Sequence, residues 1–261
     1  MTVRSIKDRH CEERSDEAIS PPGVMSGGGE TPAILAERVC KRYRSLTAVD
    51  HLDLSVRRGE VFCLFGPNGS GKTTFLRMLA GYISPSAGRI TVAGHDVVRD
   101  GLAARRKIGY VPETVPLYDH MRVDEFLRFM AQLRGVAAAA VEAALDRVVG
   151  LLALGEVVRK PVRDLSRGYR QRTALAQALV HEPEIVVLDE PTNGLDPRQI
   201  IEMRGLIRSL AGRHTVLMSS HILSEIEKTA DRAGLLLDGK LLGVRTIAEI
   251  ADLEVWFLSV T

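Results

Sequence analysis

The first third of the chain consists of short runs of apolar and β-branched residues separated by turn residues. Runs of this kind, bounded by glycine and charged residues such as Arg58-Gly59-Glu60, are typical of β-strands. The pattern predicts strands at Ile34 to Val39, Leu52 to Val56, Val61 to Phe65 and Arg89 to Val92. We therefore expect this part of the chain to be largely β-sheet.

The spacing of apolar positions changes between Arg122 and Leu152. Apolar residues there recur every three or four positions, which is the period of an amphipathic helix. We interpret this region as a helical subdomain inserted at about residues 114–170. The two apolar stripes are Val123, Phe126, Leu127, Met130 and Leu133, then Val141, Leu145, Val148, Val149 and Leu152.

After this insertion, short apolar runs alternate with helical patterns. The runs Ile185 to Leu188, Thr215 to Met218 and Ala233 to Leu237 are predicted strands. Asp196-Pro197 is a good helix start, because Asp caps the first turn and Pro fits the first helical position. Strands that alternate with helices predict an α/β fold with a mainly parallel sheet.

The composition is that of an ordinary globular protein. The 261 residues are 45% hydrophobic and 26% charged, which is enough to bury a substantial core. A net charge of +2 gives no field that would favour nucleic acid, so we expect no nucleic-acid partner. Cys11, Cys40 and Cys63 are widely spaced, which fits reduced thiols better than disulfides or zinc. The apolar runs are far shorter than the roughly 20 residues of a membrane span.

Residues 1–30 mix charged residues with Ser, Pro and Gly and have neither helical nor strand periodicity. We interpret them as a disordered extension of a domain at residues 31–261. The stretch from His10 to Ile19 is similar to peptides that arise when bacterial intergenic repeats are read as protein. Met25 is therefore an alternative start of the chain.

The stretch from Gly66 to Thr74 directly follows the predicted strand Val61 to Phe65 and opens a helical pattern. It fits the phosphate-binding loop G-x-x-x-x-G-K-[ST]. Its four fixed positions coincide in a chain of this length with a chance of roughly 1 in 100. The alternative is a glycine-rich turn with a solvated lysine, and the flanking strand and helix argue against it.

The residue types of this loop suit phosphate binding. Its small residues allow consecutive backbone N–H groups to turn inward around phosphate oxygens, and the helix beginning near Gly71 adds the positive end of its dipole. Lys72 is expected to reach the β- and γ-phosphates, and the Thr73 hydroxyl to face a magnesium ion. The expected nucleotide-binding residues are Gly66, Pro67, Asn68, Gly69, Ser70, Gly71, Lys72, Thr73 and Thr74.

A second motif, Leu-Ser-Arg-Gly-Tyr-Arg-Gln-Arg, runs from Leu165 to Arg172. Here the chain resembles the ATP-binding cassette (ABC) ATPases, whose signature reads L-S-x-G-x-x-Q-R. The five fixed positions match by chance with a probability on the order of 1 in several thousand. The other family motifs follow in the expected order, and the resemblance covers Ala33 to Val260. The signature residues Arg-Gly-Tyr-Arg-Gln-Arg and the Pro-Glu pair that ends at Glu113 resemble those of the ATPases of ABC-2-type exporters, including the gliding-motility type.

The resemblance implies a P-loop NTPase core with a mainly parallel sheet, an N-terminal antiparallel β subdomain and the inserted helical subdomain. It also implies ATP and Mg²⁺ as cofactors. Asp189, at the end of a buried strand, would hold the magnesium ion, and Glu190 would polarise the attacking water. With Lys72 and Glu190, His221 would form the catalytic set as the histidine that contacts the γ-phosphate, although a lone histidine can also be structural. Tyr43 would stack on the adenine, and a packed core tyrosine is the alternative.

The signature also bears on assembly. Ser166 and Gly168 lie at the expected N-terminus of a helix, where a hydroxyl and N–H groups can bind a phosphate. In the family this phosphate belongs to ATP held by a second subunit, so the resemblance implies a head-to-tail dimer, a homodimer in this reading, with Asp196 at the same seam.

The resemblance further implies a separate integral membrane permease, which would keep the chain at the cytoplasmic face of the bacterial inner membrane. Residues between Val115 and Asp124 follow Glu113 and lead into the helical stripe, so they are expected to help contact this permease. For Tyr118 and Asp119 an exposed loop without a partner is the alternative.

Two residues depart from the family pattern. Glu113 stands where most members have glutamine, and we expect it to bind ATP and to act through the magnesium ion, since a carboxylate can coordinate the metal. Arg167 replaces the commoner glycine of the signature, and it either adds a cation near the dimer interface or points to solvent.

The sequence thus predicts an ATP-hydrolysing subunit that couples dimer closure to export of an unknown substrate through a separate permease. The alternative is a soluble ABC ATPase that remodels a cytosolic complex. Members that act in translation usually carry two cassettes, whereas this chain has one phosphate loop. A GTPase-like switch is disfavoured because no guanine-specifying N-K-x-D motif is present.

Overall fold

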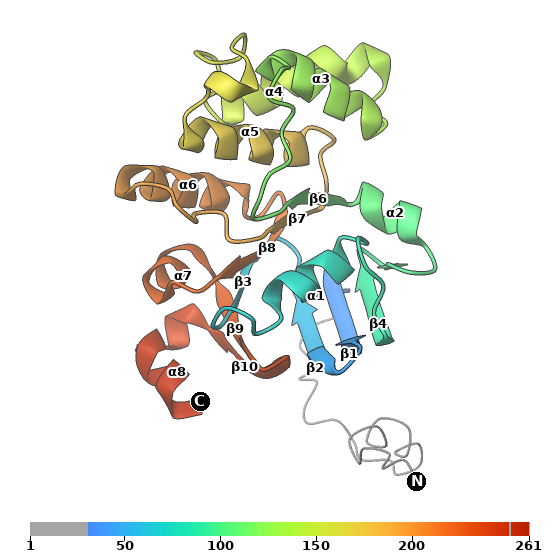
Figure 1. The fold of residues 1–261 in the computed structure, drawn as a ribbon, viewed down its shortest axis with the longest axis vertical. Coiled ribbons are helices and arrows are strands. Elements are labelled where there is room, and N and C mark those ends of the chain that lie inside the picture. The colour runs from blue at the N-terminus through green and yellow to red at the C-terminus, as the bar shows by residue number, and fades with distance from the viewer. Residues whose placement is uncertain (1–30, 251, 261) are drawn as a thin grey trace. The chain divides into compact units, whose positions relative to one another are not determined.

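The computed structural model describes residues 31–250 and 252–260 (Figure 1). The interpretation of residues 1–30, with Cys11 and the alternative start at Met25, falls outside the described residues. The strands are β1 (Ile34–Tyr43), β2 (Leu46–Val56), β3 (Val61–Phe65), β4 (Ala87–Val92), β5 (His95–Asp96), β6 (Ile108–Val111), β7 (Ile185–Leu188), β8 (Thr215–Ser220), β9 (Arg232–Leu237) and β10 (Lys240–Thr246). The α-helices are α1 (Lys72–Leu79), α2 (Gly101–Arg106), α3 (Val123–Leu133), α4 (Val141–Leu151), α5 (Arg167–Leu179), α6 (Pro197–Leu210), α7 (Leu223–Thr229) and α8 (Leu253–Val260).

The strands form two sheets. One has the order β2-β1-β4-β5 and is antiparallel. The other has the order β10-β9-β3-β8-β7-β6 and is parallel from β9 to β6, with β10 antiparallel at one edge. The predicted α/β class with a mainly parallel sheet and an N-terminal antiparallel subdomain is confirmed.

The sequence pattern located seven of the ten strands among the described residues, at least in part. β3 and β7 have the predicted bounds, whereas β5, β6 and β10 were not predicted. β6 is four residues long and contains Gly109, which packs so closely on α5 that a Cβ there would lie 2.1 Å from the Ala178 carbonyl oxygen. A glycine demanded by a neighbouring helix weakens the strand signal in the sequence.

Three helices, α3, α4 and α5, lie together at one end of the described domain (Figure 1). The stretch interpreted as a helical subdomain, residues 114–170, contains α3 and α4, and α5 begins at Arg167. α6 starts as expected after Asp196, whose Oδ1 accepts a hydrogen bond of 2.9 Å from the Gln199 N–H. No helix among the described residues combines the length and apolar character needed to span a bilayer.

The parallel sheet separates two hydrophobic cores. Side chains of β3 alternate between them: Val61, Cys63 and Phe65 pack with the helical elements α3 to α6, whereas Phe62 and Leu64 pack with α1 and the antiparallel sheet. All five are buried. Burial on both faces fixes the register of β3, because a shift by one residue would exchange the two sets. The loop that follows β3 is therefore held firmly at one edge of the sheet.

Candidate functional site

The carboxyl ends of three neighbouring parallel strands bring the expected catalytic residues together. β8 lies between β3 and β7, with Phe65 opposite Ser220 and Leu188 opposite Met218. The phosphate-binding loop follows β3, the two acidic residues follow β7, and His221 follows β8. Ligand sites in open parallel sheets form at this edge.

The phosphate-binding loop fits only because two of its glycines lack side chains. Gly66 has a φ of 152°, and a Cβ there would lie 2.0 Å from the Leu236 carbonyl oxygen. Gly71 has a φ of 106°, and a Cβ there would lie 2.3 Å from the Ala48 carbonyl oxygen. Contacts this short exclude any larger residue at the two positions. The loop is therefore held between β9 and β2, and its backbone stays curved with the N–H groups directed inward.

Lys72 is buried and directed into the loop. Its Nζ donates to the carbonyl oxygens of Gly66, at 2.7 Å, and Pro67, at 3.1 Å. The same nitrogen lies 3.7 Å from Glu190 Oε1. Its charge is therefore balanced by loop carbonyls and a carboxylate at the place where the sequence predicted phosphate binding.

Asp189 is buried beside the first residues of α1. Its Oδ1 accepts hydrogen bonds from Thr73 Oγ1, at 3.1 Å, and Ser219 Oγ, at 2.7 Å. Burial raises the pKa of the Asp189 carboxyl above its ordinary value. The two hydrogen bonds oppose this shift, and the nearby charge of Glu113 adds to it.

The second carboxylate oxygen of Asp189, Oδ2, is buried and has no hydrogen-bond partner. An unpaired buried anion next to a threonine hydroxyl and a second carboxylate is an arrangement that a hard divalent cation would stabilise. The residues present therefore fit a magnesium ion.

Glu190 and His221 form a pair next to Lys72. His221 Nδ1 lies 2.9 Å from Glu190 Oε2, while Glu190 Oε1 faces Lys72. The Glu190 backbone has a φ of +48° and donates its N–H to Ser219 Oγ at 2.9 Å. A positive φ is uncommon for a residue with a side chain, and at this position it accompanies a carboxylate held between two cationic or hydrogen-bonding groups.

These residues share one cavity of about 620 Å³. It brings together ten of the residues that the sequence predicted, and Asp189 adjoins it through Thr73. The predicted residues that line it are Tyr43, Asn68, Gly69, Gly71, Lys72, Thr73, Thr74, Glu113, Glu190 and His221. Tyr43 is 45% exposed, which excludes the core position considered above; its stacking on adenine stays a prediction.

Six residues that line the cavity were missed by the sequence analysis: Leu46, Thr47, Ala48, Asn193, Asp238 and Gly239. Two had a usable signal. Asp238-Gly239 is a typical hairpin turn, and its Gly239 N–H donates to the Ser70 carbonyl at 3.0 Å. Asn193 lies between two predicted site residues in the sequence. Leu46 to Ala48 reach the cavity only through the folding of β2 over the loop.

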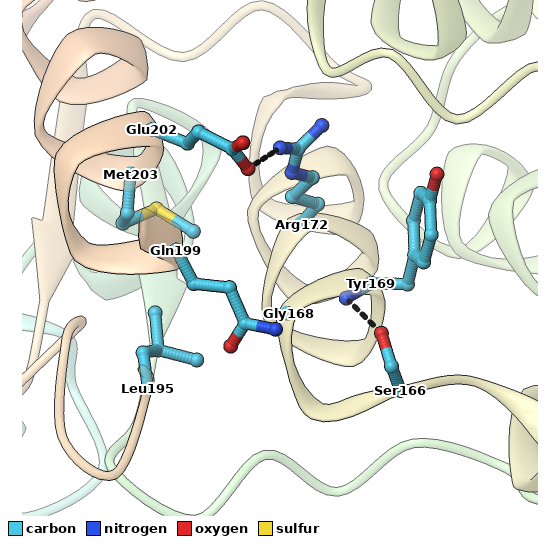
Figure 2. Close-up of a pocket in the computed structure, with 8 residues that line it drawn as sticks. All are labelled: Ser166, Gly168, Tyr169, Arg172, Leu195, Gln199, Glu202 and Met203. Carbon is cyan, nitrogen blue, oxygen red and sulfur yellow. Dashed lines mark hydrogen bonds and ion pairs between the residues drawn. The ribbon is translucent and has the colours of Figure 1, made fainter. Parts of the chain in front are cut away.

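The predicted residues Ser166, Gly168 and Asp196 lie elsewhere. Ser166 and Gly168 line a separate cavity of about 180 Å³ between α5 and α6 (Figure 2). Ser166 caps α5 by accepting the Tyr169 N–H at 3.4 Å. Figure 2 shows the Gln199 side chain directed at Gly168, where a Cβ would lie 2.9 Å from Gln199 Cδ. Gly168 thus permits the close approach of α5 to the capped start of α6.

Comparisons with known proteins decide the family. Residues 49–193 match the family described as ABC transporter. The chain belongs to the ABC transporter family. It is 42% identical over 204 residues to the bacitracin transport ATP-binding protein BcrA of Bacillus licheniformis, covering 77% of this chain and 66% of that protein.

Two further relatives support this assignment. The daunorubicin resistance ATP-binding protein DrrA3 of Streptomyces coeruleorubidus is 40% identical over 219 residues, covering 84% of this chain and 69% of that protein. Among solved structures, the ATP-binding subunit of an ABC transporter superposes with a TM-score of 0.79 at 26% identity, covering 87% of this chain and 99% of that one. This chain spans about two thirds of the length of the two relatives.

The two departures from the ABC pattern meet at Asn193. Glu113 Oε1 accepts a hydrogen bond from Asn193 Nδ2 at 3.0 Å. Arg167 Nη2 donates to the Asn193 carbonyl oxygen at 2.8 Å. Arg167 is therefore exposed but hydrogen-bonded to its own chain, so it does not simply point to solvent. Its place near a dimer interface stays a prediction.

We expect Asp189→Asn to stabilise the nucleotide-free ABC subunit at neutral pH. A carboxyl whose pKa is raised in the folded chain holds its proton more tightly there than in the unfolded chain. The free energy of unfolding therefore falls as pH rises from the unfolded pKa of about 3.9 through the folded pKa. Asn removes this loss, so urea unfolding at pH 7 should give Asp189→Asn a higher free energy of unfolding than the unmodified chain. The difference between the two should shrink below about pH 3.9.

Asp196→Asn is the matched control, because the same atoms change at an exposed helix cap where Asn also caps. It should stay within about 0.5 kcal/mol of the unmodified chain. A lower unfolding free energy for Asp189→Asn at pH 7 would show that the buried carboxylate is well compensated in the empty site.

Proposed function

We propose that this ABC subunit binds and hydrolyses ATP with Mg²⁺ and drives export through a separate membrane permease. One observation supports the chemistry above all others. A single cavity of about 620 Å³ holds the ammonium group of Lys72, the carboxylate of Glu190 and the imidazole of His221 at the end of the phosphate-binding loop. The attacking water, the γ-phosphate and the positive charge that balances it can all be positioned there.

In this proposal each residue has a limited task. The loop N–H groups and Lys72 bind the phosphate oxygens and balance their charge. Glu190 orients the attacking water and accepts its proton, and His221, 2.9 Å from Glu190, holds that carboxylate and contacts the γ-phosphate. Asp189, Thr73 and Glu113 would hold the magnesium ion, which supplies positive charge that stabilises the phosphate oxygens.

A second chain would complete the site. Ser166 and Gly168 do not line the cavity with Lys72 and open instead on the cavity between α5 and α6. The start of α5 presents a hydroxyl and helix N–H groups, which suit a phosphate. Such a site serves ATP only if the nucleotide comes from another cassette, so we propose a head-to-tail homodimer with Asp196 at the seam.

A third cavity supports a permease partner. It has a volume of about 170 Å³ and is lined by Ala80, Gly81, Tyr82, Arg105, Ile108, Tyr110 and Arg134. Among the described residues the guanidinium groups of Arg105 and Arg134 form no ion pair. Burial lowers the pKa of Arg134. The buried Tyr110 hydroxyl also has no hydrogen-bond partner.

Arg134 is half-buried and the neighbouring Arg105 is exposed. A half-buried cation without a counter-charge favours an anionic partner. This cavity lies between the phosphate-loop core and the end of α3, so an acidic side chain of the permease would fit it. Together with the stretch Val115 to Asp124, it would form the docking surface that keeps the chain at the cytoplasmic face of the inner membrane. The relatives named for bacitracin and daunorubicin support export and leave the substrate of this chain open.

We expect Glu190→Gln to abolish ATP turnover while ATP still binds. The amide keeps the shape of the side chain but cannot accept the proton of the attacking water, so kcat should fall by about 10²–10⁴. Binding of a fluorescent ATP analogue should stay within a few-fold, and size-exclusion chromatography with ATP should show a dimer. A matched change outside all three cavities, Glu254→Gln at an exposed position of α8, should leave kcat nearly unchanged. Turnover by Glu190→Gln at the normal rate would remove Glu190 from the role of general base.

We expect Arg134→Gln to weaken association with the permease without lowering ATP binding. The test is co-purification of this chain with a six-helix membrane protein encoded by an adjacent gene. Arg106→Gln, on α2 but outside the cavity, is the control and should co-purify normally. Equal recovery of the membrane protein with both variants would exclude this cavity as a docking site.

A further inference from the structure

Arg167 contacts the loop that follows the two carboxylates, Asp189 and Glu190. Its Nη2 donates to the Asn193 carbonyl, and its guanidinium group covers Gly194. A Cβ at Gly194 would lie 2.2 Å from the guanidinium carbon, and the φ of this glycine is +69°. The signature helix α5 is thereby tied to residues 193 and 194 through its first residue.

Asn193 makes a second contact in the opposite direction. Its side-chain Nδ2 donates to Glu113 Oε1 at 3.0 Å, and its backbone N–H donates to the Glu190 carbonyl at 3.1 Å. Asn193 therefore contacts three functional segments: the loop after β6 through Glu113, the end of β7 through Glu190, and α5 through Arg167.

These contacts connect the two cavities. Glu113 and Asn193 line the large cavity with Lys72 and Glu190. Arg167 lies between Ser166 and Gly168, which line the cavity between α5 and α6. A displacement of Glu113 toward a bound cation would pull on the Asn193 amide, and Asn193 would carry Arg167 and the start of α5 with it.

An asparagine suits this position better than its close relatives. Its amide donates to the negative Glu113, while the carbonyl of its own peptide unit accepts from the positive Arg167. Hydrogen bonds to charged partners are roughly twice as strong as neutral ones. Aspartate would set a carboxylate against Glu113, and alanine would lose the side-chain contact. In one chain these groups are exposed, and exclusion of water in the closed dimer would strengthen them.

We propose that Asn193 is a positioning residue that makes the placement of Ser166 and Gly168 depend on Glu113 of the same chain. The proposal rests on the function proposed above, because it requires that the start of α5 completes the ATP site of a second chain. It assigns one shared role to Glu113 and Arg167: they are the two charged ends of a relay centred on Asn193.

The test is a double-mutant cycle on the full-length chain, with steady-state ATP hydrolysis as the readout. Asn193→Ala should lower kcat about fivefold and change the Kd of a fluorescent ATP analogue less than twofold, the size expected for a charge-assisted hydrogen bond at a partly exposed site. Glu113→Ala should cause a loss at least as large. Asn193→Ala added to Glu113→Ala should cause no further loss, because the contact is already broken.

Glu113→Gln is the conservative variant, since Gln keeps an acceptor oxygen for Asn193. In that background Asn193→Ala should again lower kcat. Arg167→Ala breaks the other end of the relay and should lower kcat with unchanged ATP binding, whereas Arg198→Ala, an exposed arginine at the start of α6, should have no effect.

If Asn193→Ala lowers kcat equally with and without Glu113→Ala, or if Asn193→Ala alone has a normal kcat, the relay is overturned. The proposed function would still stand if Glu190→Gln stops hydrolysis. If Glu190→Gln hydrolyses ATP normally, the proposed function fails, whatever the cycle shows.

Discussion

The side-by-side pairing of β3, β8 and β7 is the constraint on which the rest of the site depends. Each strand is buried on both faces, so none can shift without moving apolar side chains into the wrong core. Their carboxyl ends place Lys72, Glu190 and His221 in one cavity, and Asp189 adjoins this cavity through Thr73. Residues more than a hundred positions apart in the sequence become neighbours because the sheet fixes the positions of the strand ends that they follow.

The site has a charge balance that is incomplete in an isolated chain. Lys72 faces Glu190, but Asp189 keeps a buried oxygen without a partner and lies close to the negative Glu113. A divalent cation and the phosphates of a nucleotide would satisfy these groups together. The start of α5 carries hydrogen-bonding groups toward another cavity. Both features favour a site that is completed by ligands and by a second cassette.

Local motifs could be predicted from the sequence, whereas contacts between motifs could not. The loop Gly66 to Thr74 and the cap at Asp196 depend on nearest neighbours, so the pattern alone located them. β6 was not predicted because Gly109 is required by close packing on α5, a helix far along the chain. Asn193 was not predicted for the same reason, because its hydrogen bonds to Glu113 and Arg167 join residues that are far apart in the sequence. The roles of Tyr43, His221 and Ser166 stay predictions.

The central claim is that each ATP is held between Lys72 of one chain and Ser166 of another. Mixing two inactive variants, Lys72→Ala and Ser166→Ala, tests it most directly. In a mixed dimer one site carries both changes and the other carries none. Random mixing should therefore restore ATP hydrolysis to at most about a quarter of the normal rate. A mixture no more active than the two variants measured separately would contradict a site shared between chains.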